Sequence, residues 1–193
     1  MARKRRSLPD EAPEVSELPD SAMRTLYVLR HAKSGWDDPT LHDHDRPLDL
    51  RGERAALIMG RYMAQRRFVP DLVLCSTARR AQETRTLAAT QWGAEPPVEV
   101  DRDLYLTGER MLLKRLARVP DDYRHVLLVA HNPDLHDLVV TLGRRGNEEL
   151  LAGVAAKFPT AAFAAIKLPL VHWADIGGAV GTLVCYTVPK DLV

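Results

Sequence analysis

Residues 26–38 read LYVLRHAKSGWDD. The first four, Leu26 to Leu29, have strand character, and the polar residues that follow keep neither a helical nor a strand period. A buried strand that breaks at once into polar side chains is typical of an open α/β sheet, where ligands bind beyond the carboxyl ends of the strands. Arg30 beside His31 is therefore placed to bind an anion, although a strand followed by a plain polar turn would look the same.

The same pattern occurs twice more along the chain. Residues 72–75 read as a buried strand that leads into Ser76-Thr77-Ala78-Arg79-Arg80, and residues 125–130 lead into His131-Asn132. Helical periodicity between the strands predicts helices over about 50–66, 78–92, 107–118 and 133–142, the last with Asn132 as its N-cap.

A short strand is expected at 98–100, and two extended segments at 161–168 and 183–188 predict an antiparallel pair at one sheet edge. The strand-helix alternation predicts a three-layer α/β/α fold whose central sheet is mainly parallel, with an antiparallel edge strand.

Composition indicates one ordinary globular domain. The chain has 193 residues, of which 46% are hydrophobic and 27% charged, and its formal net charge is +1. That balance gives no support to binding of nucleic acid or membrane surfaces, and no apolar run is long enough to span a membrane. Cys75 and Cys185 lie in apolar segments, which fits reduced thiols and the cytoplasm rather than a disulfide framework.

The first 22 residues differ from the rest. Four basic residues at 3–6 precede five acidic residues and three prolines, without the apolar segment of a secretory signal. We expect residues 1–22 to be a disordered polyampholyte tail and residues 23–193 to form the single domain.

The three predicted strand ends carry Arg30 and His31, Arg79, and His131. If the strands are parallel neighbours, these side chains meet in one small volume, and only an anion such as phosphate makes that gathering of positive charge favourable. A neutral His31 is a competent nucleophile for phosphorus, with Arg30, Arg79 and a protonated His131 stabilising the charge on the equatorial oxygens.

These residues resemble the histidine phosphatase superfamily, also called phosphoglycerate mutase-like. The likeness rests on Arg30-His31, on Ser76 to Arg79 and on His131-Asn132, each after a strand, and it covers roughly residues 24–192. Asp45-Arg46-Pro47-Leu48 with Arg51-Gly52 resembles a segment of the SixA-type phosphohistidine phosphatases. The resemblance implies His31 as nucleophile, Arg30 and Arg79 as phosphate clamps and His131 as electrostatic partner. It also implies substrate contacts, which we expect from Ser34, Asp37, Arg46, Ser76 and Asn132.

Two positions depart from the family pattern. The Gly that usually follows the nucleophile is Ala32, and the glutamate acid of larger members is missing from residues 103–107. Because the N–P bond of phosphohistidine is labile, solvent can protonate its leaving nitrogen, so the missing acid favours that substrate over phosphomonoesters. Asp103 remains a candidate acid.

Other interpretations stay open. His42-Asp43-His44-Asp45 has the composition of a metal site, but we interpret it as a solvated loop that rims the pocket. We interpret Arg66, Arg67 and Arg80 as solvated charge. The chain could also dephosphorylate a small metabolite, or bind phosphate without turnover. We expect a metal-independent, cofactor-free phosphoric hydrolase that acts as a monomer on a phosphorylated protein or a small phosphorylated substrate.

Overall fold

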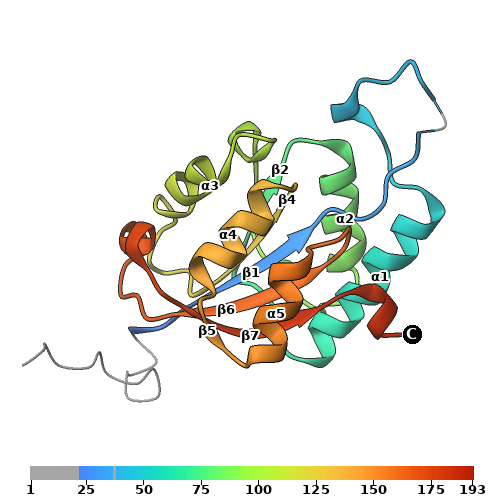
Figure 1. The fold of residues 1–193 in the computed structure, drawn as a ribbon. Coiled ribbons are helices and arrows are strands. Elements are labelled where there is room, and N and C mark those ends of the chain that lie inside the picture. Colours follow the sequence, from blue (N-terminus) through green and yellow to red (C-terminus); the bar gives the residue numbers. More distant parts are fainter. Residues whose placement is uncertain (1–21, 37) are drawn as a thin grey trace, which may run out of the picture.

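The computed structural model describes residues 22–36 and 38–193, so the predicted tail and Asp37 lie outside the described residues. A seven-stranded sheet crosses the molecule in the order β3-β2-β4-β1-β6-β7-β5 (Figure 1). The strands are β1 (Arg24–Arg30), β2 (Leu72–Ser76), β3 (Val98–Asp101), β4 (His125–Ala130), β5 (Arg145–Gly146), β6 (Phe163–Leu168) and β7 (Thr182–Thr187).

Strands β3, β2, β4 and β1 pair in parallel, which brings their carboxyl ends to one edge of the sheet. Strand β6 runs antiparallel to both of its neighbours, β1 and β7. The predicted antiparallel pair of β6 and β7 is therefore confirmed, although β7 is not the outermost strand. The outer place belongs to β5, whose two residues pair with β7 and are too few to stand out in the sequence.

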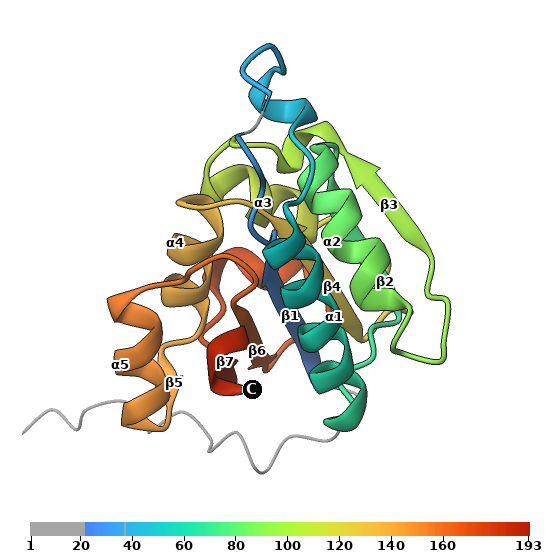
Figure 2. The ribbon, with the colours of Figure 1, turned by 90° about the vertical axis from the view of Figure 1, so that its right-hand side faces the viewer.

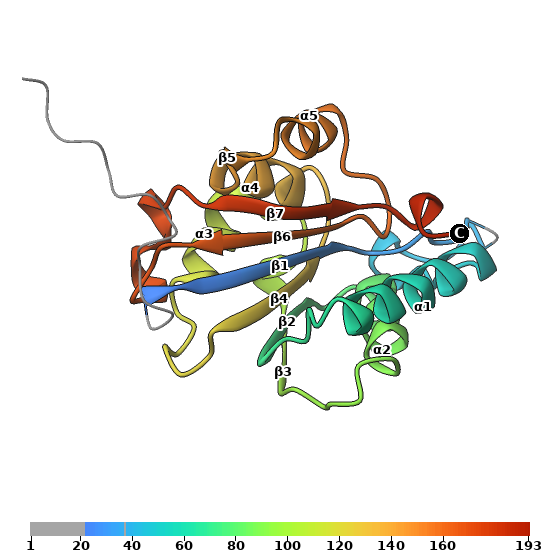
Figure 3. The same ribbon diagram turned by 90° about the horizontal axis from the view of Figure 1, so that it is seen from below.

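The helices form two layers over the sheet, as the views in Figures 2 and 3 show. On one face lie α1 (Leu50–Gln65) and α2 (Arg79–Ala89), and on the other lie α3 (Glu109–Leu116), α4 (Asp134–Leu142) and α5 (Glu148–Ala156). Alternation along β1 supplies both cores, because Leu26 and Val28 pack in one apolar cluster while Tyr27 and Leu29 pack in the other. The fold is the predicted three-layer α/β/α arrangement.

The boundaries show where the sequence was informative. The buried strands and α1 lie where they were predicted, whereas α2 ends at Ala89 and α4 begins at Asp134. Asn132 is not the N-cap of α4, since Pro133 occupies that place. Helix α5 was not predicted at all. Within the described residues, no helix is long and apolar enough to cross a membrane.

Candidate active site

The carboxyl ends of β1 and β4 place the two candidate histidines together. Arg30 is level with Ala130 in the parallel register, and the His31 amide donates to the Ala130 carbonyl at 3.1 Å. The His31 and His131 rings follow directly, with centroids 4.9 Å apart. They line a cavity of about 310 Å³ together with Arg30, Lys33, Ser34, Asp43, Arg46, Arg80, Leu106, Asn132 and Thr160.

His31 presents one ring nitrogen for chemistry. Its Nδ1 lies 2.8 Å from the Ala32 carbonyl oxygen, and because a carbonyl only accepts, Nδ1 carries the proton. The lone pair is then on Nε2. Burial lowers the pKa of His31 to about 4 against the opposing effect of the Ala32 hydrogen bond, and the charges of Arg80 and Arg30 lower it further. The ring is therefore neutral at neutral pH, which is the form in which an imidazole nitrogen can act as a nucleophile.

Ala32, which replaces the usual glycine of the family, is fully buried. Its amide donates to the Thr84 hydroxyl at 2.9 Å, a bond that ties the turn after β1 to α2. The turn therefore accommodates the methyl group, as expected.

His131 is held by partners on both ring nitrogens. An Arg80 Nη2 lies 3.4 Å from Nδ1, and because a guanidinium only donates, the ring proton sits on Nε2 and points to the Ser76 hydroxyl at 2.8 Å. Burial lowers the pKa of His131 to about 3, and the neighbouring His31 and Arg80 lower it further. His131 is therefore neutral when no anion is bound, rather than protonated as predicted. A bound phosphate dianion would favour the imidazolium.

The arginine that α2 brings to the cavity is Arg80, not Arg79. The Arg80 side chain is 5% exposed, and its guanidinium bonds to the backbone carbonyl and the carboxylate of Asp43 as well as facing His131. Arg79 is 56% exposed, pairs with Glu83 one helical turn away at 2.7 Å, and lines a different surface pocket. Two expectations are therefore wrong: Arg79 does not join the histidines, and Arg80 is not a solvated charge.

Arg30 and Asn132 are anchored to the same backbone group. The Phe158 carbonyl accepts from Arg30 Nη1 at 2.9 Å and from Asn132 Nδ2 at 2.8 Å. Burial, with a smaller contribution from Arg80, lowers the pKa of Arg30. Both side chains line the cavity, as predicted, and the segment between α5 and β6 positions them.

Asp43 is a second site residue, besides Arg80, that sequence reasoning missed. Its carboxylate accepts from Arg46 Nη1 at 2.9 Å, Arg80 Nη2 at 2.9 Å and the Tyr105 hydroxyl at 2.8 Å. Burial alone would raise the pKa of Asp43, but the Tyr105 hydrogen bond and the two arginines outweigh it and lower the pKa to about 2. Its only sequence signal was its place in the His42–Asp45 run.

That run does not gather as a metal site. While Asp43 turns to Arg46 and Arg80, His44 bonds to Asp45 and to the Thr77 hydroxyl. Across the described residues no group of three or more His, Cys, Asp or Glu side chains is placed to hold a metal ion. The side chains of Asp43 and His44 therefore bond to separate partners.

Arg46 and Ser34 line the cavity as predicted, but the Arg46 guanidinium already donates hydrogen bonds to other groups of the protein. Its Nε donates to the Gly35 carbonyl, one Nη to Asp43 and the other to the Ser34 hydroxyl, while its Cζ lies 3.2 Å from the Trp36 ring centroid. Arg46 therefore fixes the loop that carries Ser34 and adds positive charge to the wall.

Two other candidates do not face the cavity. Ser76 is fully buried behind His131 and does not line the cavity, so the expectation of direct substrate contact is corrected to support of the ring. Asp103 is exposed and also lies outside the lining, with its backbone carbonyl accepting from the Thr107 hydroxyl. Asp103 is therefore not placed to protonate the leaving group, and solvent remains as the candidate proton donor.

The cavity carries four cationic side chains, Arg30, Lys33, Arg46 and Arg80, and among the described residues its lining includes one carboxylate, that of Asp43. Two neutral imidazoles lie among them. The unprotonated Nδ1 of His131 faces Arg80, whereas the unprotonated Nε2 of His31 has no hydrogen-bond donor among the described residues. A dianion offsets the excess charge, and the guanidinium forks match phosphoryl oxygens. The arrangement is chemically suited to in-line attack of His31 on a phosphoryl group.

Comparisons with known proteins agree with this geometry. The sequence model of the histidine phosphatase superfamily (branch 1) matches residues 26–105. A protein of Nakamurella multipartitia whose name is putative phosphohistidine phosphatase SixA is 30% identical, with 86% of this chain and 96% of that chain covered and a TM-score of 0.75.

A second such protein, from Agrobacterium tumefaciens, is 28% identical, with 86% and 98% covered and a TM-score of 0.72. An uncharacterised protein of Mycobacterium tuberculosis is 35% identical over 164 residues, which are 84% of this chain and all of that protein.

Proposed function

This chain belongs to the histidine phosphatase superfamily and is a SixA-like phosphatase, and we propose that its substrate is phosphohistidine on a protein, hydrolysed without a metal ion through a phosphorylated His31. The observation that supports this most strongly is the unprotonated Nε2 of His31 in a cavity of converging cations.

The reaction then has two displacements. His31 Nε2 forms a bond to phosphorus while the N–P bond to the substrate imidazole breaks, and the leaving nitrogen takes a proton from solvent. Nδ1 stays bonded to the Ala32 carbonyl throughout, which fixes the ring for attack. Arg30 and Arg80 stabilise the charge on the equatorial oxygens. Water next attacks phosphorus, the Nε2–P bond breaks, and phosphate leaves.

The choice of phosphohistidine rests on the absence of a placed acid. Among the residues that the structure describes, Asp43 is the one carboxylate in the cavity lining, and its pKa of about 2 keeps it ionised at neutral pH. An alkoxide leaving group needs a proton donor placed beside its oxygen. The N–P bond to imidazole is labile, so the leaving nitrogen can take its proton from solvent. Phosphohistidine is therefore the better substrate for this set of side chains.

The test compares wild-type protein with His31→Ala on a phosphohistidine peptide and on an aryl phosphomonoester, with a chelator present throughout. We expect chelator-resistant turnover that prefers the peptide, an acid-labile phosphoenzyme after rapid quench, and loss of both in His31→Ala with phosphate binding retained. His172→Ala is the matched control, because that ring is exposed and pairs with Asp121. Turnover by His31→Ala at the wild-type rate refutes the mechanism.

We propose further that the protein acts as a monomer in the cytoplasm. Cys75 and Cys185 are buried and unpaired, and burial raises the pKa of Cys75 to about 12, so its reactive thiolate is almost absent. Light scattering coupled to gel filtration measures the oligomeric state, and a stable dimer would contradict the proposal.

A further inference from the structure

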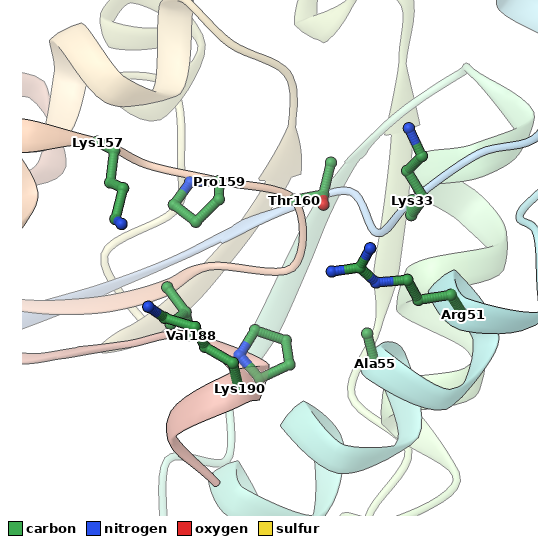
Figure 4. Close-up of a pocket in the computed structure, with 9 residues that line it drawn as sticks. Lys33, Arg51, Ala55, Lys157, Pro159, Thr160, Val188 and Lys190 are labelled. Atoms are coloured by element: carbon green, nitrogen blue, oxygen red, sulfur yellow. The ribbon is translucent and has the colours of Figure 1, made fainter. Parts of the chain in front are cut away.

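A second cavity lies beside the catalytic one, and its walls are strongly cationic. It has a volume of about 210 Å³ and is lined by Lys33, Arg51, Ala55, Lys157, Pro159, Thr160, Val188, Pro189 and Lys190. Figure 4 shows Arg51 reaching from α1 towards the segment of Pro159 and Thr160, with Lys157 and Lys190 on the opposite side. Three separate parts of the chain thus contribute positive charge to one hollow.

These charges lack partners of opposite sign in the described structure. The lining includes four cationic side chains and no carboxylate. Among the ion pairs formed within residues 22–36 and 38–193, none involves Lys33, Arg51, Lys157 or Lys190. Like charges around a small cavity repel one another, and an anionic group that enters relieves that repulsion.

The second cavity shares a wall with the catalytic one. Lys33 and Thr160 line both, and the amide of Ala161, next to Thr160, donates to the His31 carbonyl. Lys33 is only two residues from the nucleophile. A substrate bound at His31 therefore extends towards the second cavity within a short span of chain, since an extended peptide advances about 3.3–3.6 Å per residue.

We propose that this cavity binds an acidic side chain of the phosphoprotein, a Glu or Asp within a few residues of the phosphohistidine. The inference rests on the proposed function and adds a substrate preference to it. Arg51, Lys157 and Lys190 supply the charge, and the hollow between them takes the carboxylate. The shared wall of Lys33 and Thr160 sets the spacing between the two anionic groups.

The experiment uses the full chain and two short phosphohistidine peptides, one with flanking Glu residues and one with Gln in their place. The test variant is Lys157→Gln with Lys190→Gln, and the control is Lys114→Gln with Lys167→Gln, which removes the same charge from exposed lysines outside both cavities. Wild-type and control proteins are expected to prefer the Glu peptide in kcat/KM by about tenfold. The test variant loses that preference and keeps its activity on the Gln peptide. Arg51→Gln gives a smaller loss, and added salt weakens the preference.

A binding measurement separates this inference from the proposed function. Fluorescence anisotropy at low salt follows a labelled Glu peptide that carries ordinary histidine, so no turnover is needed. Weaker binding to the test variant than to the control supports the acidic subsite, whether or not the phosphopeptides are hydrolysed. Failure to hydrolyse either phosphopeptide refutes the proposed function but leaves the subsite standing. Equal binding to both variants, equal turnover of the two phosphopeptides by wild-type protein, or equal loss on both phosphopeptides in the test variant overturns the subsite.

Discussion

Replacement of Arg80 by Met is expected to remove most of the phosphatase activity, whereas the same change at Arg79 is expected to leave it intact. Arg80 is 5% exposed and faces the cavity beside His131. It is positioned to donate to the phosphoryl oxygens as charge develops. Arg79 is 56% exposed and contacts Glu83. The two residues are adjacent and chemically identical, so each is the natural control for the other.

The expected magnitudes follow from these environments. Loss of one preorganised donor to a transition-state oxyanion costs about 3–4 kcal/mol, which corresponds to a fall of about 10²–10³ in kcat for Arg80→Met. The pair of Arg79 with Glu83 is an exposed ion pair along a helix, worth about 0.3–0.5 kcal/mol of stability. Arg79→Met should therefore change kcat by less than about twofold.

The assay is steady-state hydrolysis of a phosphohistidine peptide, with thermal unfolding of each variant measured alongside. Arg80→Lys is included because it keeps the charge but not the planar fork, and we expect it to recover only part of the activity. The reasoning is refuted if Arg79→Met loses as much activity as Arg80→Met, or if a folded Arg80→Met protein turns over at the wild-type rate.

Four further outcomes test other parts of the structure. Because the pKa of His31 is about 4, kcat/KM should stay level from pH 8 to pH 6 and fall only near pH 4 to 5; a fall centred on 6.5 in a pH–rate profile would contradict the neutral buried ring. Folding stability should decline as pH falls from about 6.5 towards 4 in urea unfolding series, since the unfolded chain binds protons at His31 and His131 that the folded chain does not. Ser76→Ala should lower kcat by about tenfold with little change in KM, because the buried Nε2–H of His131 loses its partner, and Ser76→Thr should recover part of the loss. Gly60→Ala should lower the midpoint of thermal unfolding, since the added Cβ would lie 2.3 Å from the Ala88 carbonyl oxygen of α2.

The sequence predicted the sheet well because its buried strands are unambiguous. Residues 26–29, 72–75 and 125–130 are short apolar runs that end in polar residues, and parallel pairing then forces their ends together. Helix α5 escaped prediction because its sequence, EELLAGVAA, is rich in small residues and leaves only Val154 fully buried. The pair of β6 and β7 is not outermost because β7 also pairs with β5, a two-residue strand that carries no signal of its own.

The error between Arg79 and Arg80 has a specific cause in helix geometry. Both follow the strand end, so strand position cannot separate them, and successive residues on a helix point about 100° apart. The buried stripe of α2 distinguishes the two arginines, because Arg80 precedes buried Thr84 by four residues and shares its face. Arg79 shares a face with Glu83, which is only partly buried. Asp43 had no comparable local signal, since its partner Arg80 is 37 residues away.

Asp43 explains how a cluster of arginines persists before an anion arrives. Its carboxylate holds Arg46 and Arg80 in place, and its pKa of about 2 means that this support is present at any working pH. A guanidinium that is already held loses little conformational freedom when a phosphoryl group binds, so more of the interaction energy remains for the transition state. The Phe158 carbonyl does the same for Arg30 without adding charge. The cavity is therefore preorganised for a dianion by one carboxylate and one backbone carbonyl.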